Sequence, residues 1–242
     1  MEFSLWFYLL LFVVAMLYAS VGHGGASGYI AVMTLFSLSP ETIRPLALLL
    51  NIGVSLFAFY RYYKSGHFKW ELFWPFIIAS VPFAFLGGRI SLQTHVFHML
   101  LGILLIFPVI HLLGLIPQQE HPRPLKVFPA IITGAVIGLL SGLIGIGGGI
   151  LLSPFLLLTG WASIKESAAV SALFIFVNSF VVFIAMGGAG AMISISMLPV
   201  ITIVYAGGLL GAQLGAFAKR PKLLKQVLAI VLLIAAAKLI FV

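Results

Sequence analysis

The stretch "SVGHGGASGYI", residues 20–30, follows an almost wholly apolar run from Phe3 to Ala19. It places glycines and a histidine where the run would otherwise continue as a membrane span. Glycine lets the backbone leave the helical conformation and approach other groups closely. Irregular backbone at membrane depth is tolerated only where protein buries it or where it lines a wet cavity. The stretch therefore predicts a helix break inside a membrane protein.

The composition of the whole chain supports that interpretation. Of the 242 residues, 62% are hydrophobic and only 7% are charged, whereas soluble domains carry about a quarter charged residues. Apolar runs recur along the chain, which is typical of an all-α, polytopic helical membrane protein. These runs cover about 3–20, 29–38, 43–60, 72–88, 96–116, 127–144, 150–160, 167–187, 192–217 and 223–242.

Several classes of function are excluded by the residues present. The chain has no cysteine, so it forms no disulfide and no thiolate metal site. Its net charge of +8 comes from short loops between apolar runs, where contact with anionic lipid explains it better than nucleic acid does. No pair of histidines has metal-ligand spacing with a carboxylate. We therefore expect the lipid bilayer as a partner, and no nucleic acid, metal or cofactor.

The two halves of the chain resemble each other. The polar segment "PQQEHPRPLK", 117–126, divides the chain almost equally. "VGHGGASG" at 21–28 corresponds to "IGIGGGIL" at 144–151, and the segment 74–90 corresponds to 198–214. Both matches fall at an offset of 123 to 124 residues. This predicts two transmembrane repeats, 1–116 and 127–242, joined by the polar loop 117–126.

Each predicted repeat contains a long run, a glycine break, a short run and three full spans. Ten helical residues rise only about 15 Å, half of a hydrocarbon core about 30 Å thick. The runs 29–38 and 150–160 are therefore expected to be half-helices or tightly packed short helices. Broken segments at corresponding positions of two repeats point to the substrate site of a transporter.

The charges favour one orientation of the repeats. If each broken unit crosses the membrane once, the repeats are parallel and the 13 Lys and Arg residues divide six against seven. If it returns to its starting side, as a re-entrant hairpin or a paired crossing, the repeats are inverted and ten of these residues share a side. The second arrangement obeys the positive-inside rule. We therefore expect inverted repeats with both termini periplasmic.

The glycine clusters suggest how an anion would be bound. Helix N-termini expose unpaired N–H groups and the positive end of the helix dipole, so they attract anions. Two half-helices that start near Gly25–Gly28 and Gly148–Gly149 would direct these ends at one buried anion. The alternative is that the small residues only allow tight helix packing.

His23 lies inside the first break and corresponds to Ile146 in the second. Its imidazole would donate to an anion or carry a proton near neutral pH. The alternative is a neutral histidine that is bonded to a backbone carbonyl.

Other polar residues occur inside or beside the spans. Asn51 and Asn178 would either bond a neighbouring helix or line a pathway. Glu41 and Glu166 stand close in sequence to Arg44 and Lys165 respectively. We expect exposed or interfacial ion pairs there.

These motifs together resemble the sulfite exporter TauE/SafE family, also called the toluenesulfonate uptake permease family. The resemblance is carried by "GHGGASGYI", "LALLLNIGVS", "SGHFKWELFWPF", "FLGGRI", "GLLSGLIGIGGGILLSPFLLL" and "VSALFIFVNS". It implies a bacterial inner-membrane protein that moves small anions, often sulfur oxyanions or organosulfonates. At matching positions it implies these pathway residues: Gly22, Gly24, Gly25, Asn51, Gly145, Gly147, Gly148, Gly149, Ser171 and Asn178.

The sequence therefore predicts a secondary transporter for a small anion such as sulfite or sulfoacetate, with alternating access. To the pathway residues just given we add His23, as a substrate ligand and proton carrier, and Ser27 from the same break. A passive anion channel and a non-transporting membrane scaffold are the alternatives. We expect no enzyme, because the chain has no HExxH motif, aspartate pair, cysteine or P-loop. A homodimer is left open.

Overall fold

The computed structural model of the chain describes residues 4–20, 22–113, 123–188 and 197–217, with 229–230, 233 and 236–237. These residues form helices and their connections, as predicted. The helices are α1 (Leu5–Ser20), α2 (Ala26–Leu35), α3 (Pro40–Lys64), α4 (Trp70–Gly88), α5 (Thr94–Leu112), α6 (Val127–Ile144), α7 (Gly149–Thr159), α8 (Ile164–Ala185) and α9 (Leu198–Phe217). Most of the predicted last run, 223–242, and much of the loop 117–126 lie outside the described residues.

The two predicted short helices are confirmed. α2 has 10 residues and α7 has 11, too few to cross a hydrocarbon core about 30 Å thick. Four of the described helices, α3, α4, α6 and α8, are long and apolar enough to cross a membrane. α3 extends beyond its predicted run 43–60 at both ends, because charged and aromatic residues can continue a helix past the hydrocarbon region.

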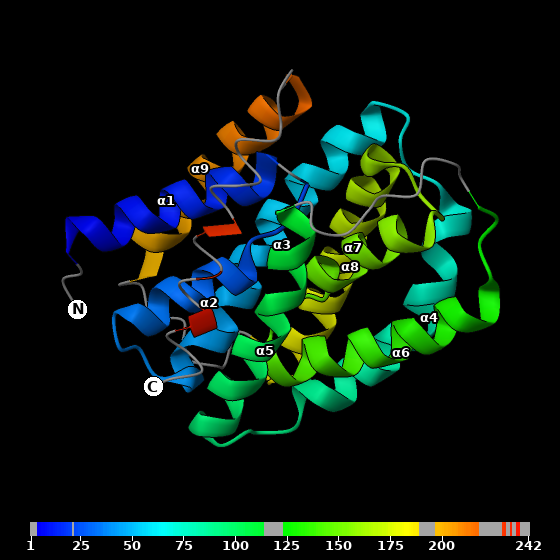
Figure 1. The fold of residues 1–242 in the computed structure, drawn as a ribbon. Helices are drawn as coiled ribbons and strands as arrows, with labels where there is room; N and C mark the ends of the chain where they lie inside the picture. The colour runs from blue at the N-terminus through cyan, green and yellow to red at the C-terminus, as the bar shows by residue number, and fades with distance from the viewer. Residues whose placement is uncertain are drawn as a thin grey trace.

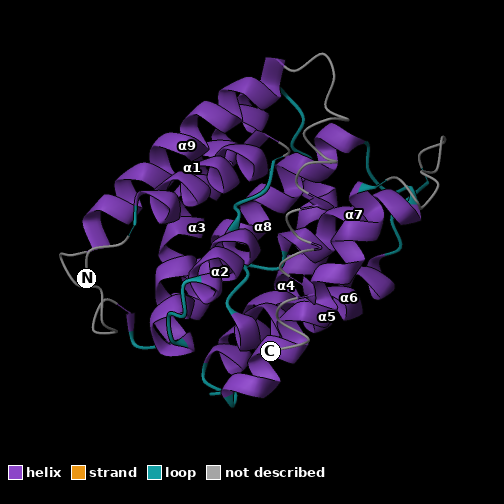
Figure 2. Cartoon of the chain, turned by 60° about the vertical axis from the view of Figure 1, so that its left-hand side comes forward, coloured by secondary structure: helices purple, strands orange, loops and turns teal. Residues whose placement is uncertain are grey.

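Two packed pairs flank a central pair of helices (Figures 1 and 2). α1 packs against α9 on one flank and α4 packs against α6 on the other, while α3 and α8 pack against each other between them. α4 also contacts α8, as α9 contacts α3. These pairings are the ones that a duplicated unit would produce, and the duplication itself stays a prediction.

Glycines allow the flanking pairs to approach closely. A Cβ atom at Gly87 of α4 would lie 2.5 Å from the backbone oxygen of Leu139 in α6. A Cβ atom at Gly211 of α9 would meet the backbone oxygen of Met16 in α1. Such contacts between small residues bring helices together in membranes, where the hydrophobic effect does not.

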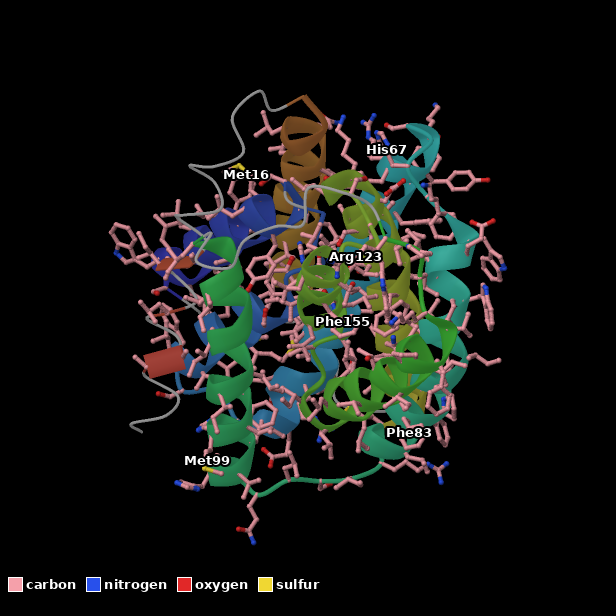
Figure 3. All side chains as sticks on the ribbon, turned by 45° about the vertical axis from the view of Figure 1, so that its right-hand side comes forward. Met16, His67, Phe83, Met99, Arg123 and Phe155 are labelled. Atoms are coloured by element: carbon pink, nitrogen blue, oxygen red, sulfur yellow. The ribbon has the colours of Figure 1, made fainter. Side chains whose placement is uncertain are left out.

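The bundle has two distinct ends. At one, Lys69 before α4 pairs with Glu166 in the first turn of α8; we call this the Lys69 end. At the other, Arg44 donates to the backbone oxygens of Ile90 and Gly142, which lie at the ends of α4 and α6; we call this the Arg44 end. Figure 3 shows His67 at the first end and Met99 at the second.

Both broken units return to the end from which they start. The ring of Phe7, in the first turn of α1, lies 5.1 Å from that of Phe36, which ends α2. The oxygen of Gly160, which ends α7, accepts a hydrogen bond of 2.7 Å from the N–H of Arg123, just before α6. This is the geometry that inverted repeats require, although the placement of either end in the cell stays a prediction.

Candidate functional site

Both half-helices begin at glycines in left-handed conformation. Gly25, at φ 97°, immediately precedes α2, and Gly148, at φ 76°, immediately precedes α7. Residues other than glycine rarely adopt these angles. The glycine clusters thus fix where each helix starts, close to the positions predicted from the sequence.

The two breaks meet at Asn51, in the middle of α3. Its Oδ1 accepts from the N–H of Ala26, the first residue of α2, at 3.2 Å. Its Nδ2 lies 3.3 Å from the oxygen of Ile146, in the second break, and 2.9 Å from Oγ of Ser179 in α8. Asn51 is fully buried. One amide therefore joins both breaks and both central helices.

Ile175 of α8 lies at the same junction. Cβ atoms placed on Gly24 and on Gly147 would each lie 2.9 Å from Cγ2 of Ile175, and each would also collide with the side chain of Asn51. In sequence, Ile175 stands 124 residues after Asn51, within the offset of the predicted repeat. Corresponding positions of the two halves thus carry a hydrogen-bonding amide and an apolar side chain.

Hydrogen bonds inside the protein satisfy the polar side chains that surround the first break. The hydroxyls of Ser27 and Tyr18 lie 2.7 Å apart, and the hydroxyl of Tyr29 donates to the oxygen of Gly24 at 2.7 Å. His23 is half-buried, and its backbone N–H donates to the oxygen of Tyr18. Gly22, the residue before His23, lies against Ala168 of α8.

The second break has buried polar atoms without a partner. Ser141 of α6 lies beside Gly148, and Ser171 of α8 lies beside Gly149. Both serines are 0% exposed, and neither hydroxyl has a hydrogen-bond partner within the described part of the chain. Native proteins leave few buried polar groups unsatisfied, so these two hydroxyls need an explanation.

Arg44 lies against the same break at the Arg44 end. Its stem is 3.7 Å from a Cβ atom placed on Gly145, the residue that ends α6. The side chain is 7% exposed, and its Nε has no partner among the described residues. Its donation to the Gly142 oxygen places a cation at the negative end of the α6 dipole, which is stabilising.

The expected ion-pair partners are wrong, although Glu166 does form an ion pair near the surface. Arg44 is buried and bonds backbone oxygens, whereas Glu41 is exposed one turn earlier. Glu166 pairs with Lys69 across two helix starts instead of with Lys165. It also accepts from the N–H of Ser163, forming a capping box at the start of α8. Lys165 and Glu166 are adjacent on α8 and do not face each other. Glu41 and Arg44 are three residues apart and could face each other, but Arg44 instead bonds backbone oxygens at the ends of α4 and α6.

Asn178 lies apart from the junction of the breaks. Its Oδ1 accepts from the hydroxyl of Ser80 in α4 at 2.8 Å, and its Nδ2 donates to the oxygen of Phe174. It therefore joins α8 to α4. The structure brings the other predicted site residues to one break or the other.

Sequence reasoning missed Arg44, Ser141 and Ser179 as site residues. The usable signal for Ser179 was its offset of 124 residues from Ser55. Arg44 carries no local signal, because its hydrogen bonds to the oxygens of Ile90 and Gly142 join segments distant in sequence. Ser141 carries none, because a serine in an apolar helix does not reveal whether its hydroxyl has a partner.

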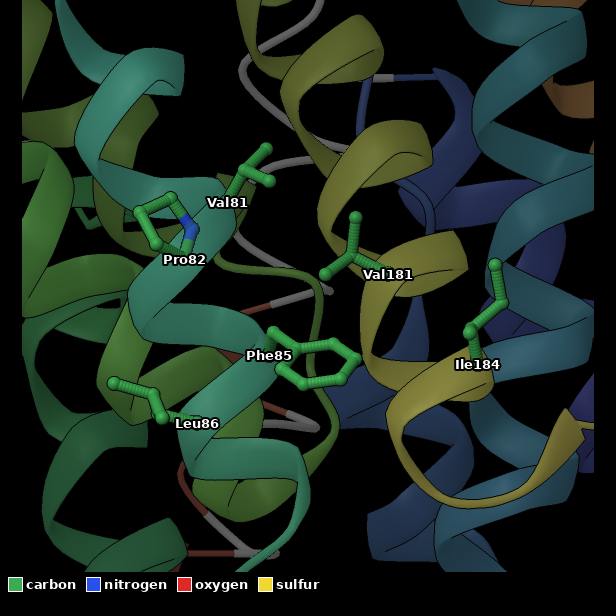
Figure 4. A pocket seen from close by; sticks show the side chains of 6 residues that line it. All are labelled: Val81, Pro82, Phe85, Leu86, Val181 and Ile184. Atoms are coloured by element: carbon green, nitrogen blue, oxygen red, sulfur yellow. The ribbon is translucent and has the colours of Figure 1, made fainter.

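An apolar pocket opens elsewhere, between α4 and α8 (Figure 4). Its lining residues are Val81, Pro82, Phe85, Leu86, Val181 and Ile184. Leu86 and Ile184 are more than half exposed, so this pocket faces the surroundings of the bundle. Within the described residues, no group of three His, Cys, Asp or Glu side chains could hold a metal ion.

Apolar helices that enclose two interrupted units are the architecture of a membrane transporter. Comparison with known families agrees, because residues 7–239 match the family described as sulfite exporter TauE/SafE. The chain belongs to this family, and it is a multi-pass membrane transporter of the TauE/SafE type.

Two curated relatives are similar to the chain. A probable membrane transporter protein of Sinorhizobium fredii is 35% identical over 240 residues, which cover 95% of each chain. A probable membrane transporter protein of Methanocaldococcus jannaschii is 27% identical over 176 residues, 66% of this chain and 63% of the relative. No solved structure matches the chain at a significant level.

Proposed function

We propose that the chain is a secondary transporter that moves a small anion by alternating access, the anion being a sulfur oxyanion or organosulfonate such as sulfite or sulfoacetate. The observation that carries the proposal is the meeting of two half-helix N-termini at Asn51. Helix N-termini are electropositive, and half-helices at the centre of two units form the ion and substrate sites of many transporters.

The charge distribution supports an anionic substrate. Arg44 is the one charged side chain that is buried among the described residues, and it has no carboxylate partner there. An unpaired charge inside a membrane bundle is costly and usually marks a substrate or ion pathway. Since a buried cation attracts anions and repels cations, Arg44 favours an anion as the ion that passes the Arg44 end of the bundle.

Transport assays test this function. Purified protein in lipid vesicles should accumulate labelled sulfite or a small sulfonate above empty vesicles, with sulfate and chloride as comparison anions across a pH gradient. A carrier should show saturation and accelerated exchange when the same anion fills the opposite side. Flux that follows the gradient without exchange would identify a passive channel, and no flux of any of these anions would refute the proposal.

The proposal includes a bacterial inner-membrane location with both termini periplasmic. The Lys69 end carries most of the described cations, namely Arg61, Lys64, Lys69, Arg123, Lys126 and Lys165. Cationic loops stay in the cytoplasm, so this end would face it. A reporter fused after Val242 should then report the periplasm, and a cytoplasmic signal would overturn the orientation.

A further inference from the structure

The two half-helices differ in how their first N–H groups are used. At α2, Asn51 accepts from the N–H of Ala26 at 3.2 Å. The corresponding residue of α7 is Gly149, 123 residues later, and no hydrogen bond engages its N–H or that of Ile150 within the described chain. The reason is chemical, since Ile175 occupies the position that corresponds to Asn51 and cannot accept a hydrogen bond.

Ser171, whose hydroxyl has no partner in the described chain, lies beside the start of α7. α7 and α8 run antiparallel, because Ser153 of α7 lies 2.9 Å from Ser167 of α8, oxygen to oxygen. Gly149 lies four residues before Ser153 on α7, and Ser171 lies four residues after Ser167 on α8. In this antiparallel register Ser171 therefore stands opposite Gly149. A Cβ atom on Gly149 would lie 3.1 Å from the backbone oxygen of Ser171. On the same helix face, Ile175 contacts Gly149 one turn further.

Ser141 reaches the same helix start from α6. Its Cβ lies 3.4 Å from a Cβ atom placed on Gly148, the residue that precedes α7. The start of α7 is therefore flanked by two fully buried hydroxyls without partners, one from α6 and one from α8. Both hydroxyls can donate, and the helix end adds two N–H donors and a positive dipole.

We propose that the transported anion binds at the second break alone, with the hydroxyls of Ser141 and Ser171 and the N–H groups of Gly149 and Ile150 as its donors. This inference rests on the proposed transport of a small anion and names the atoms that hold it. Donors from three segments suit an oxyanion with several oxygen atoms, such as sulfite. At the first break the buried hydroxyls of Tyr18, Ser27 and Tyr29 are already bonded within the protein, and this break positions Ala26 against Asn51.

The experiment compares Ser141→Ala and Ser171→Ala with a matched control, Ser167→Ala. Ser167 lies one turn before Ser171 on α8 and is equally buried, but its hydroxyl is paired with Ser153. Uptake of labelled sulfite into vesicles gives the KM of each variant. Melting of the purified protein in detergent without sulfite gives its stability.

The KM for sulfite and the melting temperature should separate the two test variants from the control. Ser141→Ala and Ser171→Ala should each raise the KM for sulfite at least about tenfold, the usual effect of losing a hydrogen bond to a charged ligand. Their melting temperatures should equal or exceed that of the unaltered protein, because an unsatisfied buried hydroxyl is removed. Ser167→Ala should melt at a lower temperature, since Ser153 loses its partner, while its KM stays unchanged.

Three outcomes would overturn the inference. An unchanged KM in both test variants of a protein that transports sulfite refutes this site and leaves the proposed function intact. A raised KM together with a lowered melting temperature in both assigns the serines to packing. A chain that transports none of the tested anions refutes the proposed function, and the assignment of an anion site falls with it.

Discussion

The first and second breaks have similar backbone conformations, but the polar side chains around them differ in their hydrogen bonding. Both contain left-handed glycines, and both precede a helix of 10 or 11 residues that starts beside Asn51 and Ile175. At the first break the polar side chains Ser27, Tyr18 and Tyr29 bond one another or the backbone. At the second break the buried hydroxyls have no partner in the described chain.

The difference shows that two helix starts with the same backbone path need not bind the same ligand. Glycines decide the path of the backbone, so two similar glycine clusters give two similar helix starts. The surrounding side chains decide whether the exposed N–H groups are already satisfied. One pair of unlike residues makes part of the difference: Asn51 accepts from the first N–H of α2, whereas Ile175 cannot accept from the first N–H of α7. Four predictions test this comparison, beginning with the largest expected effect.

Gly147→Leu should prevent folding. Gly147 has a φ of 73°, and a Cβ atom there would lie 2.5 Å from Nδ2 of Asn51 and 2.6 Å from Oγ of Ser179. A left-handed residue costs about 1–2 kcal/mol and overpacking about 1–3 kcal/mol or more, so we expect a loss of about 4 kcal/mol. The yield of monodisperse protein in detergent measures this.

Gly66→Leu is the matched control, because Gly66 also has a positive φ, 74°, but has nothing within 4 Å of its Cβ position. We expect a loss of only about 1–2 kcal/mol from backbone strain. Similar yields for both variants would show that the space around Gly147 is not needed.

Asn51→Leu should cost roughly 3 kcal/mol and stop transport. It leaves Ala26 N–H, the Ile146 oxygen and Ser179 without their common partner, and each orphaned buried group costs about 1–3 kcal/mol. Asn178→Leu, which separates α8 from Ser80 of α4, should destabilise the protein but retain the affinity for the anion. Melting and uptake kinetics measure both, and equal losses of affinity would mean that the site extends to Asn178.

Tyr18→Phe should cost about 1 kcal/mol, the net value of the hydrogen bond to Ser27. We expect no change in KM, because the first break is structural in the proposed scheme. Thermal melting and sulfite uptake check the two parts separately. An altered KM at unchanged stability would assign anion binding to the first break as well.

His23→Ala should have the smallest effect, a change in the pH dependence of flux. An imidazole changes charge between about pH 5 and 8, whereas Ile146 at the corresponding position cannot titrate. Uptake in vesicles from pH 5 to 8 should therefore change shape in His23→Ala more than in Ile146→Ala. Identical profiles in the two variants would remove His23 from the mechanism.

Much of the fold could be predicted from local patterns. The glycine clusters predicted the starts of both short helices, because glycine readily adopts the left-handed angles that Gly25 and Gly148 have. α2 starts at Ala26, within the expected interval Gly25–Gly28 and three residues before the apolar run 29–38, since Gly25 supplies the turn and small residues then fit inside the helix. The apolar runs predicted the spans.

The ligands of the site were less predictable. Asn51 and Ser171 were identified, but Arg44 was expected in an interfacial ion pair and is buried instead. Ser141 had no signal, since a serine in an apolar helix looks the same whether its hydroxyl is satisfied or not. Arg44 acquires its role from a contact with a residue 98 positions away in sequence.

The sequence by itself determined the helical membrane class, the two interrupted units and the glycine positions, because hydrophobicity and backbone freedom are local properties of residues. Only the tertiary structure decided that Asn51 joins both breaks, that Arg44 lies buried beside Gly145, and that Ser141 and Ser171 flank one helix start. Which buried polar group finds a partner depends on the register of packed helices, and no single segment encodes that register.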